Sequence, residues 1–96
     1  MSENAAVLPA APARLTQAEF ADYLRTCEAA AGALSAGQEA RLDASALQTF
    51  DSSALAVLLA VRRRVLSVGA QLRIVGLPQR LRDLATLYGV SELLPA

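Results

Sequence analysis

The sequence contains no histidine, no lysine and no tryptophan, and Cys27 is its single cysteine. Histidine is the side chain that most often acts as general base or metal ligand, so its absence argues against most hydrolase and metalloenzyme sites. One cysteine can form neither an internal disulfide nor a zinc site that needs several thiolates. Between residues 40 and 82 the acidic residues are Asp43 and Asp51, too few to hold magnesium or calcium. We therefore expect no metal, no cofactor and no enzymatic activity.

An excess of charge is also missing, because nine arginines balance nine acidic residues and the net charge at pH 7 is 0. Binding to nucleic acid depends largely on a basic surface that neutralises phosphates. Arg62, Arg63 and Arg64 are consecutive, so on a helix they point in different directions, and no aromatic platform accompanies them. The sequence therefore predicts no nucleic-acid partner.

The sequence has no long hydrophobic run. The longest apolar stretch without a charge is Ser52–Val61, whereas a helix that spans a membrane needs about 20 such residues. Residues 1–12 lack a basic start and contain two prolines, which argues against a secretory signal. Yet 54% of the residues are hydrophobic and the mean hydropathy is +0.35. We expect no direct membrane insertion, and an apolar surface that a protein partner covers.

Hydrophobic periodicity and turn residues predict strands and helices in alternation, the pattern of an α/β domain. Residues 1–12 form a short N-terminal segment with an edge strand at Ala5–Leu8 and a turn at Pro9–Pro12, and residues 13–96 form a single domain. In that domain we expect strands at Ala13–Thr16, Glu39–Ala44 and Gln71–Val75, a connection at Ser45–Phe50, helices from Thr16 to Ala33, over Ser52–Val68 and from Pro78 to Tyr88, and a terminal element at Val90–Leu94. Together they predict a small mixed β-sheet flanked by helices.

Two patterns mark where helices begin. Thr16 and Glu19 have the spacing of a capping box, in which the Thr16 hydroxyl accepts a hydrogen bond from the Glu19 N–H and the Glu19 side chain reaches back. Asp51 stands directly before the apolar run of the second helix, where aspartate is favoured as N-cap. We therefore predict Thr16 and Asp51 as the caps of the first and second helices.

Ser52 and Ser53 are then first-turn residues beside free backbone N–H groups at the positive end of the helix dipole. A serine nucleophile needs an adjacent base, and the nearby groups in the sequence are Asp43 and Asp51, so catalysis is disfavoured. Three interpretations of the two hydroxyls stay open: helix capping, acceptance of a phosphate and contact with a partner.

The second helix carries two apolar stripes. At about 100° per residue, one stripe faces the sheet and consists of Ala54, Val57, Leu58, Val61, Val65 and Val68. A sheet needs no second stripe, and this one consists of Leu55, Leu59, Arg62 and Leu66, with Arg63 beside it. Either it packs against a neighbouring helix of the same domain, or it forms a partner surface of leucine ringed by arginine.

Residues 42–56, Leu-Asp-Ala-Ser-Ala-Leu-Gln-Thr-Phe-Asp-Ser-Ser-Ala-Leu-Ala, resemble the central signature of STAS domains. That signature is an apolar strand ending in Asp-Leu-Ser, then a hydrophobic-Asp-Ser-Ser/Ala-Gly-Leu element that opens a helix; Ala54 replaces the usual glycine. The segment Leu72–Pro78 and the leucine-rich residues after it up to Pro95 are similar to MlaB-type STAS subunits of phospholipid transporters in Gram-negative bacteria. The resemblance runs from about Ala13 to the end and implies a STAS-like α/β fold.

The resemblance also implies a function. MlaB-type proteins are non-catalytic subunits that bind the MlaF-like ATPase subunit of an ABC transporter, in a complex with a permease and a lipid-binding subunit. They are cytoplasmic, peripheral on the inner membrane through that complex, and serve the lipid asymmetry of the outer membrane. Their hydroxyl at the position of Ser52 lies at the ATPase interface. In anti-sigma factor antagonists the hydroxyl at the position of Ser53 accepts phosphate, so a phosphorylation-controlled partner switch is the alternative.

From the stripe and the resemblance together we predict the residues of a partner-binding site. Ser53 is also the candidate phosphoacceptor. The predicted site comprises Ser52, Ser53, Leu55, Leu59, Arg62, Arg63 and Leu66.

Overall fold

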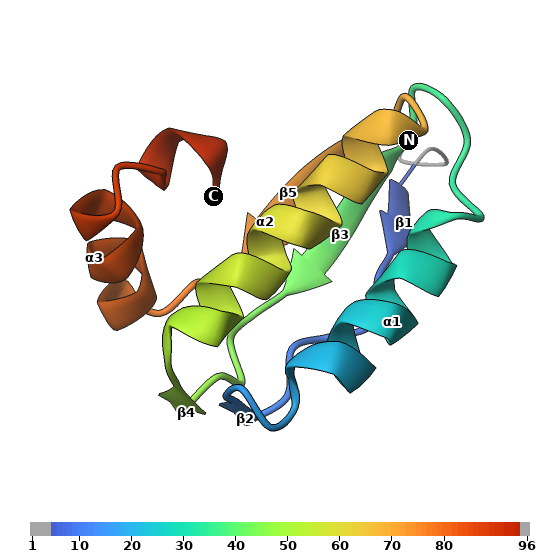
Figure 1. Cartoon of the computed structure of the whole chain (residues 1–96). Coiled ribbons are helices and arrows are strands. Elements are labelled where there is room, and N and C mark those ends of the chain that lie inside the picture. Colours follow the sequence, from blue (N-terminus) through green and yellow to red (C-terminus); the bar gives the residue numbers. More distant parts are fainter. Residues whose placement is uncertain (1–4, 95–96) are drawn as a thin grey trace.

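The computed structural model describes residues 5–94, and within them strands and helices alternate along the chain (Figure 1). The helices are α1 (Phe20–Ala31), α2 (Ser52–Ser67) and α3 (Gln79–Leu87), followed by one 3-10 turn, η1 (Ser91–Leu93). The strands are β1 (Ala5–Val7), β2 (Arg14–Leu15), β3 (Glu39–Asp43), β4 (Thr49–Phe50) and β5 (Gln71–Val75). The predicted α/β class, a small STAS-like sheet flanked by helices, is confirmed.

The strands form a three-stranded sheet in the order β1-β3-β5 and a separate pair, β2-β4. Each pairing between described strands is parallel, with Ala6 beside Ala40 and Ala40 beside Leu72. The sequence analysis expected a mixed sheet. The pairs are parallel because α1 lies between β1 and β3 in the sequence and α2 between β3 and β5, and a helical crossover returns the chain to the edge where it started.

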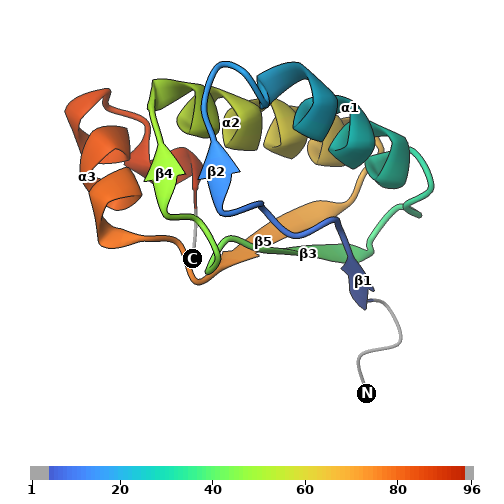
Figure 2. The ribbon, with the colours of Figure 1, turned by 90° about the horizontal axis from the view of Figure 1, so that it is seen from below.

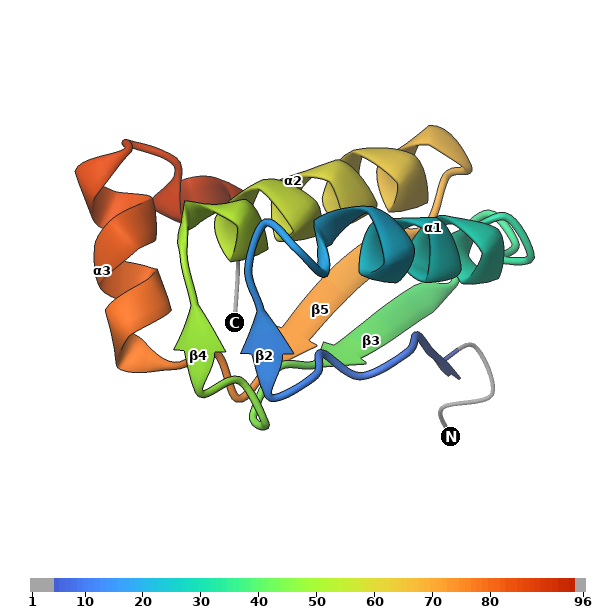
Figure 3. The same ribbon diagram turned by 60° about the horizontal axis from the view of Figure 1, so that its bottom comes forward.

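Both long helices cover the same face of the sheet (Figure 2). In Figure 3, α1 and α2 run side by side on one side of β3 and β5, and α3 stands apart near one end of α2. Strand β3 matches this arrangement, since Ala40 and Leu42 are buried under the helices while Arg41 is exposed. The strand predicted at Glu39–Ala44 is thus buried on one face and open on the other.

The segment between β1 and β2 follows the central strand. The predicted edge strand at Ala5–Leu8 is confirmed as β1, although residues 1–4 of the N-terminal segment lie outside the described residues. The turn predicted at Pro9–Pro12 is wrong. The Leu8 N–H donates to the Arg41 carbonyl at 2.9 Å and the Ala11 N–H to the Asp43 carbonyl at 2.9 Å. The chain therefore continues along β3, because a strand end offers carbonyls that need donors.

Helix α1 begins later than predicted, so Thr16 is not its cap. The Thr16 N–H and hydroxyl both donate to Glu19 Oε1, at 2.7 and 2.8 Å, while the Glu19 N–H donates to the Thr16 carbonyl. One carboxylate thus satisfies both donors and closes a tight turn, and α1 starts at Phe20 with Glu19 as N-cap. The Thr16 N–H is the main cause that lowers the pKa of Glu19.

The boundaries of α2 and α3 lie within one residue of those predicted from the sequence. Helix α3 begins after Pro78, which has φ −62° as its ring requires, and the positive φ of Gly89, +72°, ends it. The chain segment expected at Val90–Leu94 forms η1. None of the helices in residues 5–94 combines the length and the apolar character that a membrane crossing requires.

Candidate partner-binding site

The start of α2 is held by Asp51, as the sequence predicts. Asp51 has an extended backbone, and its Oδ1 accepts a hydrogen bond from the Ser53 N–H at 2.8 Å. Its Oδ2 accepts from the Gln17 N–H at 3.4 Å, which ties α2 to the turn before α1. The Ser53 N–H is the main cause that lowers the pKa of Asp51 below its ordinary value. Asp51 is therefore an ionised cap and a weak base at neutral pH.

The two serines differ in exposure. Ser52 is exposed, and its hydroxyl has no hydrogen-bond partner within residues 5–94. Ser53 is half-buried, and its hydroxyl helps to lower the pKa of Asp51. Among residues 5–94, the carboxylate beside the two hydroxyls is that of Asp51, and it is committed to capping, so it is poorly suited to activate a nucleophile. This arrangement suits a contact made by Ser52 more than a reaction.

The capping role of Asp51 leads to a pH prediction. Asp51→Ala should lower the melting temperature at pH 7. Asp51→Asn should lower it much less, because asparagine is an equally favoured N-cap. The folded state lowers the pKa of Asp51, so the charge contributes stability above the unfolded-state pKa and loses it as the pH falls through the folded-state pKa. The difference between wild type and Asp51→Asn should therefore vanish at low pH. Melting curves from pH 7 to pH 2 measure this difference in melting temperature. A difference that grows on acidification would contradict the role of Asp51 as a charged N-cap.

The loops after β3 and β5 pack against each other beside this site. Asp43 Oδ1 accepts from the Ser45 N–H at 2.9 Å, and the Ser45 hydroxyl is the main cause that lowers the pKa of Asp43. A Cβ on Gly76 would lie 2.6 Å from the Ser45 Cβ, so only glycine allows this approach. The contact fixes where the chain leaves β5 to begin α3.

An arginine of α3 lies against β4, the strand that precedes Asp51. The Arg80 guanidinium carbon is 4.7 Å from the centroid of the Phe50 ring, within the range of a cation–π contact. The sequence analysis missed both β4 and this contact. No local pattern could have revealed them, because β4 has two residues and Arg80 comes from a different element.

The second stripe of α2 is divided between the core and the surface. Leu55 is only 3% exposed and belongs to the core, so little of its side chain is accessible to a partner in this structure. Its burial agrees with the alternative that a neighbouring helix of the same domain covers this part of the stripe, since both α1 and α3 contact α2. Leu59 and Arg62 are half-buried, Arg63 is exposed, and Leu66 is 45% exposed. For Leu59, Arg62, Arg63 and Leu66 a partner contact stays a prediction.

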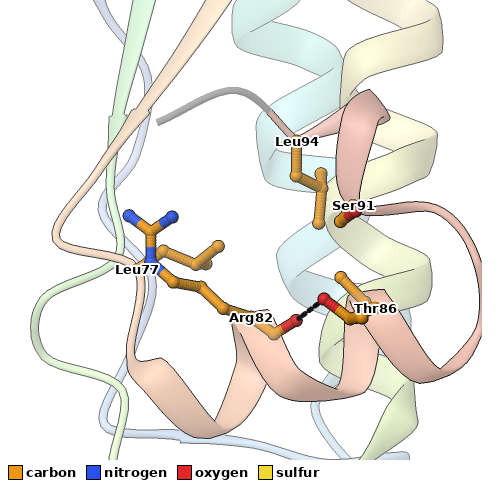
Figure 4. A pocket seen from close by; sticks show the side chains of 6 residues that line it. Leu77, Arg82, Thr86, Ser91 and Leu94 are labelled. Carbon is orange, nitrogen blue, oxygen red and sulfur yellow. Dashed lines mark hydrogen bonds between the residues drawn. The ribbon is translucent and has the colours of Figure 1, made fainter.

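A pocket of about 250 Å³ lies between α3 and η1 (Figure 4). Leu77 and Leu94 form its apolar wall, and Arg82, Thr86 and Ser91 form its polar rim. The Thr86 hydroxyl donates to the Arg82 carbonyl at 3.1 Å. No carboxylate or thiol lines this pocket in the described part of the chain, and no group of three or more potential metal ligands assembles between residues 5 and 94. The pocket has donors but no acid–base pair.

Comparison with known proteins identifies the family. No curated protein matches the chain. Residues 13–95, most of the chain, match the family described as "Mlab, STAS domain". STAS domains generally serve as non-catalytic regulatory or accessory modules. The chain therefore belongs to the MlaB-like STAS domain family.

Proposed function

We propose that this protein is a non-catalytic accessory subunit of an ABC-type phospholipid transporter that serves the lipid asymmetry of the outer membrane. It binds and stabilises or activates the MlaF-like ATPase on the cytoplasmic side of the inner membrane, in a complex with a permease and a lipid-binding subunit. The observation that carries the proposal is the match of residues 13–95 to the MlaB-like family. Binding only the assembled ATPase would stabilise that state by mass action.

The surface around the start of α2 supports this proposal. Ser52 is exposed in the first turn of α2, and Arg63 and Leu66 are exposed further along the same helix. A hydroxyl, a cation and an aliphatic side chain on one rigid helix present polar and apolar contacts without prior ordering of a loop. Such preorganisation lowers the entropy lost on binding.

The alternative, an anti-sigma factor antagonist switched by phosphorylation, depends on Ser53. A phosphate there would carry about −1.5 to −2 charges. It would lie next to the Asp51 carboxylate, which accepts from the Ser53 N–H at 2.8 Å. Repulsion between the two anions offsets the attraction of the helix dipole for the phosphate. The half-buried Ser53 hydroxyl is thus less suited to modification than the exposed Ser52 hydroxyl.

The two serines separate these functions. The wild-type chain should co-purify with an MlaF-like ATPase, and Ser52→Ala should weaken that binding about 2- to 13-fold, as expected for loss of one hydrogen bond of about 0.5–1.5 kcal/mol. Ser53→Ala should bind like wild type. Affinity is measured by calorimetry on the purified proteins, with melting temperatures recorded for each variant.

Each variant serves as the other's control, because both remove one hydroxyl from the first turn of α2. Unchanged affinity of Ser52→Ala, together with phosphate on Ser53 in cells, would contradict the transporter function and support the phosphorylation switch. In that case Ser53→Asp should imitate the modified protein.

A further inference from the structure

The pocket between α3 and η1 has an apolar wall and a polar rim for which the proposed function gives no use. Leu77, Ala85 and Leu94 of the wall are buried, whereas Thr86 and Ser91 of the rim are exposed. Its volume of about 250 Å³ is roughly eight times the 30 Å³ or so that one molecule occupies in liquid water. The pocket therefore has room for a molecule of about eight non-hydrogen atoms and is too small for a nucleotide or a phospholipid.

Arg82 supplies the charge of this pocket. Its side chain extends toward Leu77 (Figure 4), and its guanidinium forms no ion pair with a described residue. The neighbouring Asp83 accepts from the Gln79 side chain at 2.9 Å and lines a different hollow, and no carboxylate from residues 5–94 lines this pocket. The guanidinium therefore keeps its donors, and their planar fork matches the two oxygens of a carboxylate.

Two hydroxyls lie on the side of the pocket away from the Arg82 guanidinium (Figure 4). The Thr86 hydroxyl donates to the Arg82 carbonyl at 3.1 Å, so it can only accept from a ligand, whereas the exposed Ser91 hydroxyl can donate or accept. Between the charged side and the hydroxyl side, the buried wall offers only aliphatic carbon. A ligand with an anionic end and a short aliphatic body matches this order of groups.

We propose that the pocket between α3 and η1 binds a small aliphatic carboxylate. The carboxylate pairs with the Arg82 guanidinium, and the aliphatic chain packs against Leu77, Ala85 and Leu94. A concave apolar surface with a few polar groups at fixed places is typical of small-molecule sites. The ligand contacts both α3 and η1, so it stabilises the folded chain in proportion to its concentration. All groups of the site belong to this chain, so its ligand can be tested without the ATPase.

Butanoate and butanamide test this site, because they have the same shape and differ in charge. Titration of the purified full chain, followed by NMR of its backbone amides, should give a Kd on the order of 1 mM for butanoate, as expected for so few atoms. The amides of Ala85, Thr86 and Ser91 should shift. Butanamide should bind at least about ten-fold more weakly, because it cannot form the charge-assisted pair. Arg82→Gln should weaken the binding of butanoate by a similar factor.

Arg80→Gln is the matched control for Arg82→Gln. Arg80 is exposed on the same helix but lines a different hollow, so this variant should bind butanoate like wild type. Both variants should keep the wild-type melting temperature without ligand, since both side chains are exposed. Absence of butanoate binding to the wild-type chain would overturn the proposal. Equal affinities for butanoate and butanamide, unchanged affinity of Arg82→Gln, or amide shifts confined to elements other than α3 and η1 would overturn it as well.

Discussion

Replacing Gly76 with alanine should lower the free energy of unfolding by roughly 2 kcal/mol or more. Gly76 has φ +72°, which L-residues rarely adopt, and an added Cβ would lie 2.6 Å from the Ser45 Cβ and 3.0 Å from its Cα. Both loops would have to separate, and with them the end of β3 and the start of α3. Urea denaturation at pH 7 measures the loss.

Gly89→Ala is the matched control for this substitution. Gly89 also has φ +72°, but nothing lies within 4 Å of a Cβ built there. Its substitution should therefore cost about 1–2 kcal/mol, the penalty of the left-handed backbone alone. The excess loss in Gly76→Ala isolates the contact with Ser45. Equal losses in the two variants would show that the close approach of the two loops does not contribute to stability.

Leu55→Glu should unfold most of the protein, whereas Leu66→Glu should leave it folded. Leu55 is 3% exposed, so the substitution removes a packed side chain, which costs about 2–5 kcal/mol, and also buries a charge. That loss approaches the whole stability of a small domain, about 5–15 kcal/mol. Leu66 lies on the same stripe but is 45% exposed, so its glutamate reaches water. Circular dichroism and thermal melts distinguish the two results.

The affinity of Leu66→Glu for the ATPase can be measured beside its melting temperature. If the exposed part of the α2 stripe contacts the ATPase, this variant should bind more weakly although its melting temperature is native. Leu59→Glu, at a half-buried position between the two, should lose both stability and affinity. A folded Leu55→Glu protein with the wild-type melting temperature would contradict the packing of this stripe into the core.

Local chemistry explains which predictions succeeded. Asp51 caps α2 because its side chain needs only the N–H two residues later, and that bond exists wherever a helix follows. Helix α3 ends within one residue of the predicted Tyr88 for a similar reason, since the positive φ of Gly89 is a property of one residue. The sheet-facing stripe of α2 is buried as predicted, apart from the half-buried Val68. These features depend on neighbours within one or two turns, which the sequence displays.

The predictions of a cap at Thr16 and of a turn at Pro9–Pro12 were wrong, and both segments form hydrogen bonds with distant parts of the chain as well as with neighbours. Thr16 and Glu19 have capping-box spacing, yet the two groups close a turn that the Asp51 carboxylate holds through the Gln17 N–H. Pro9 precedes a segment that bonds along β3 instead of turning, and its carbonyl accepts from the Tyr23 hydroxyl at 2.7 Å. In both places the segment also forms a hydrogen bond with an element far away in the sequence, which the local pattern does not display.

The sequence by itself determined the α/β class, the boundaries of α2, β5 and α3 and the STAS resemblance, since periodicity, caps and turn residues act within a few positions. Only the tertiary structure decided which apolar residues of α2 are exposed and which are buried in the core. It alone brought Arg80 onto Phe50 and left Leu87 in water. Helical spacing indicates that two residues share a stripe. Whether they are exposed depends on which elements pack against that stripe, and those elements are distant in the sequence.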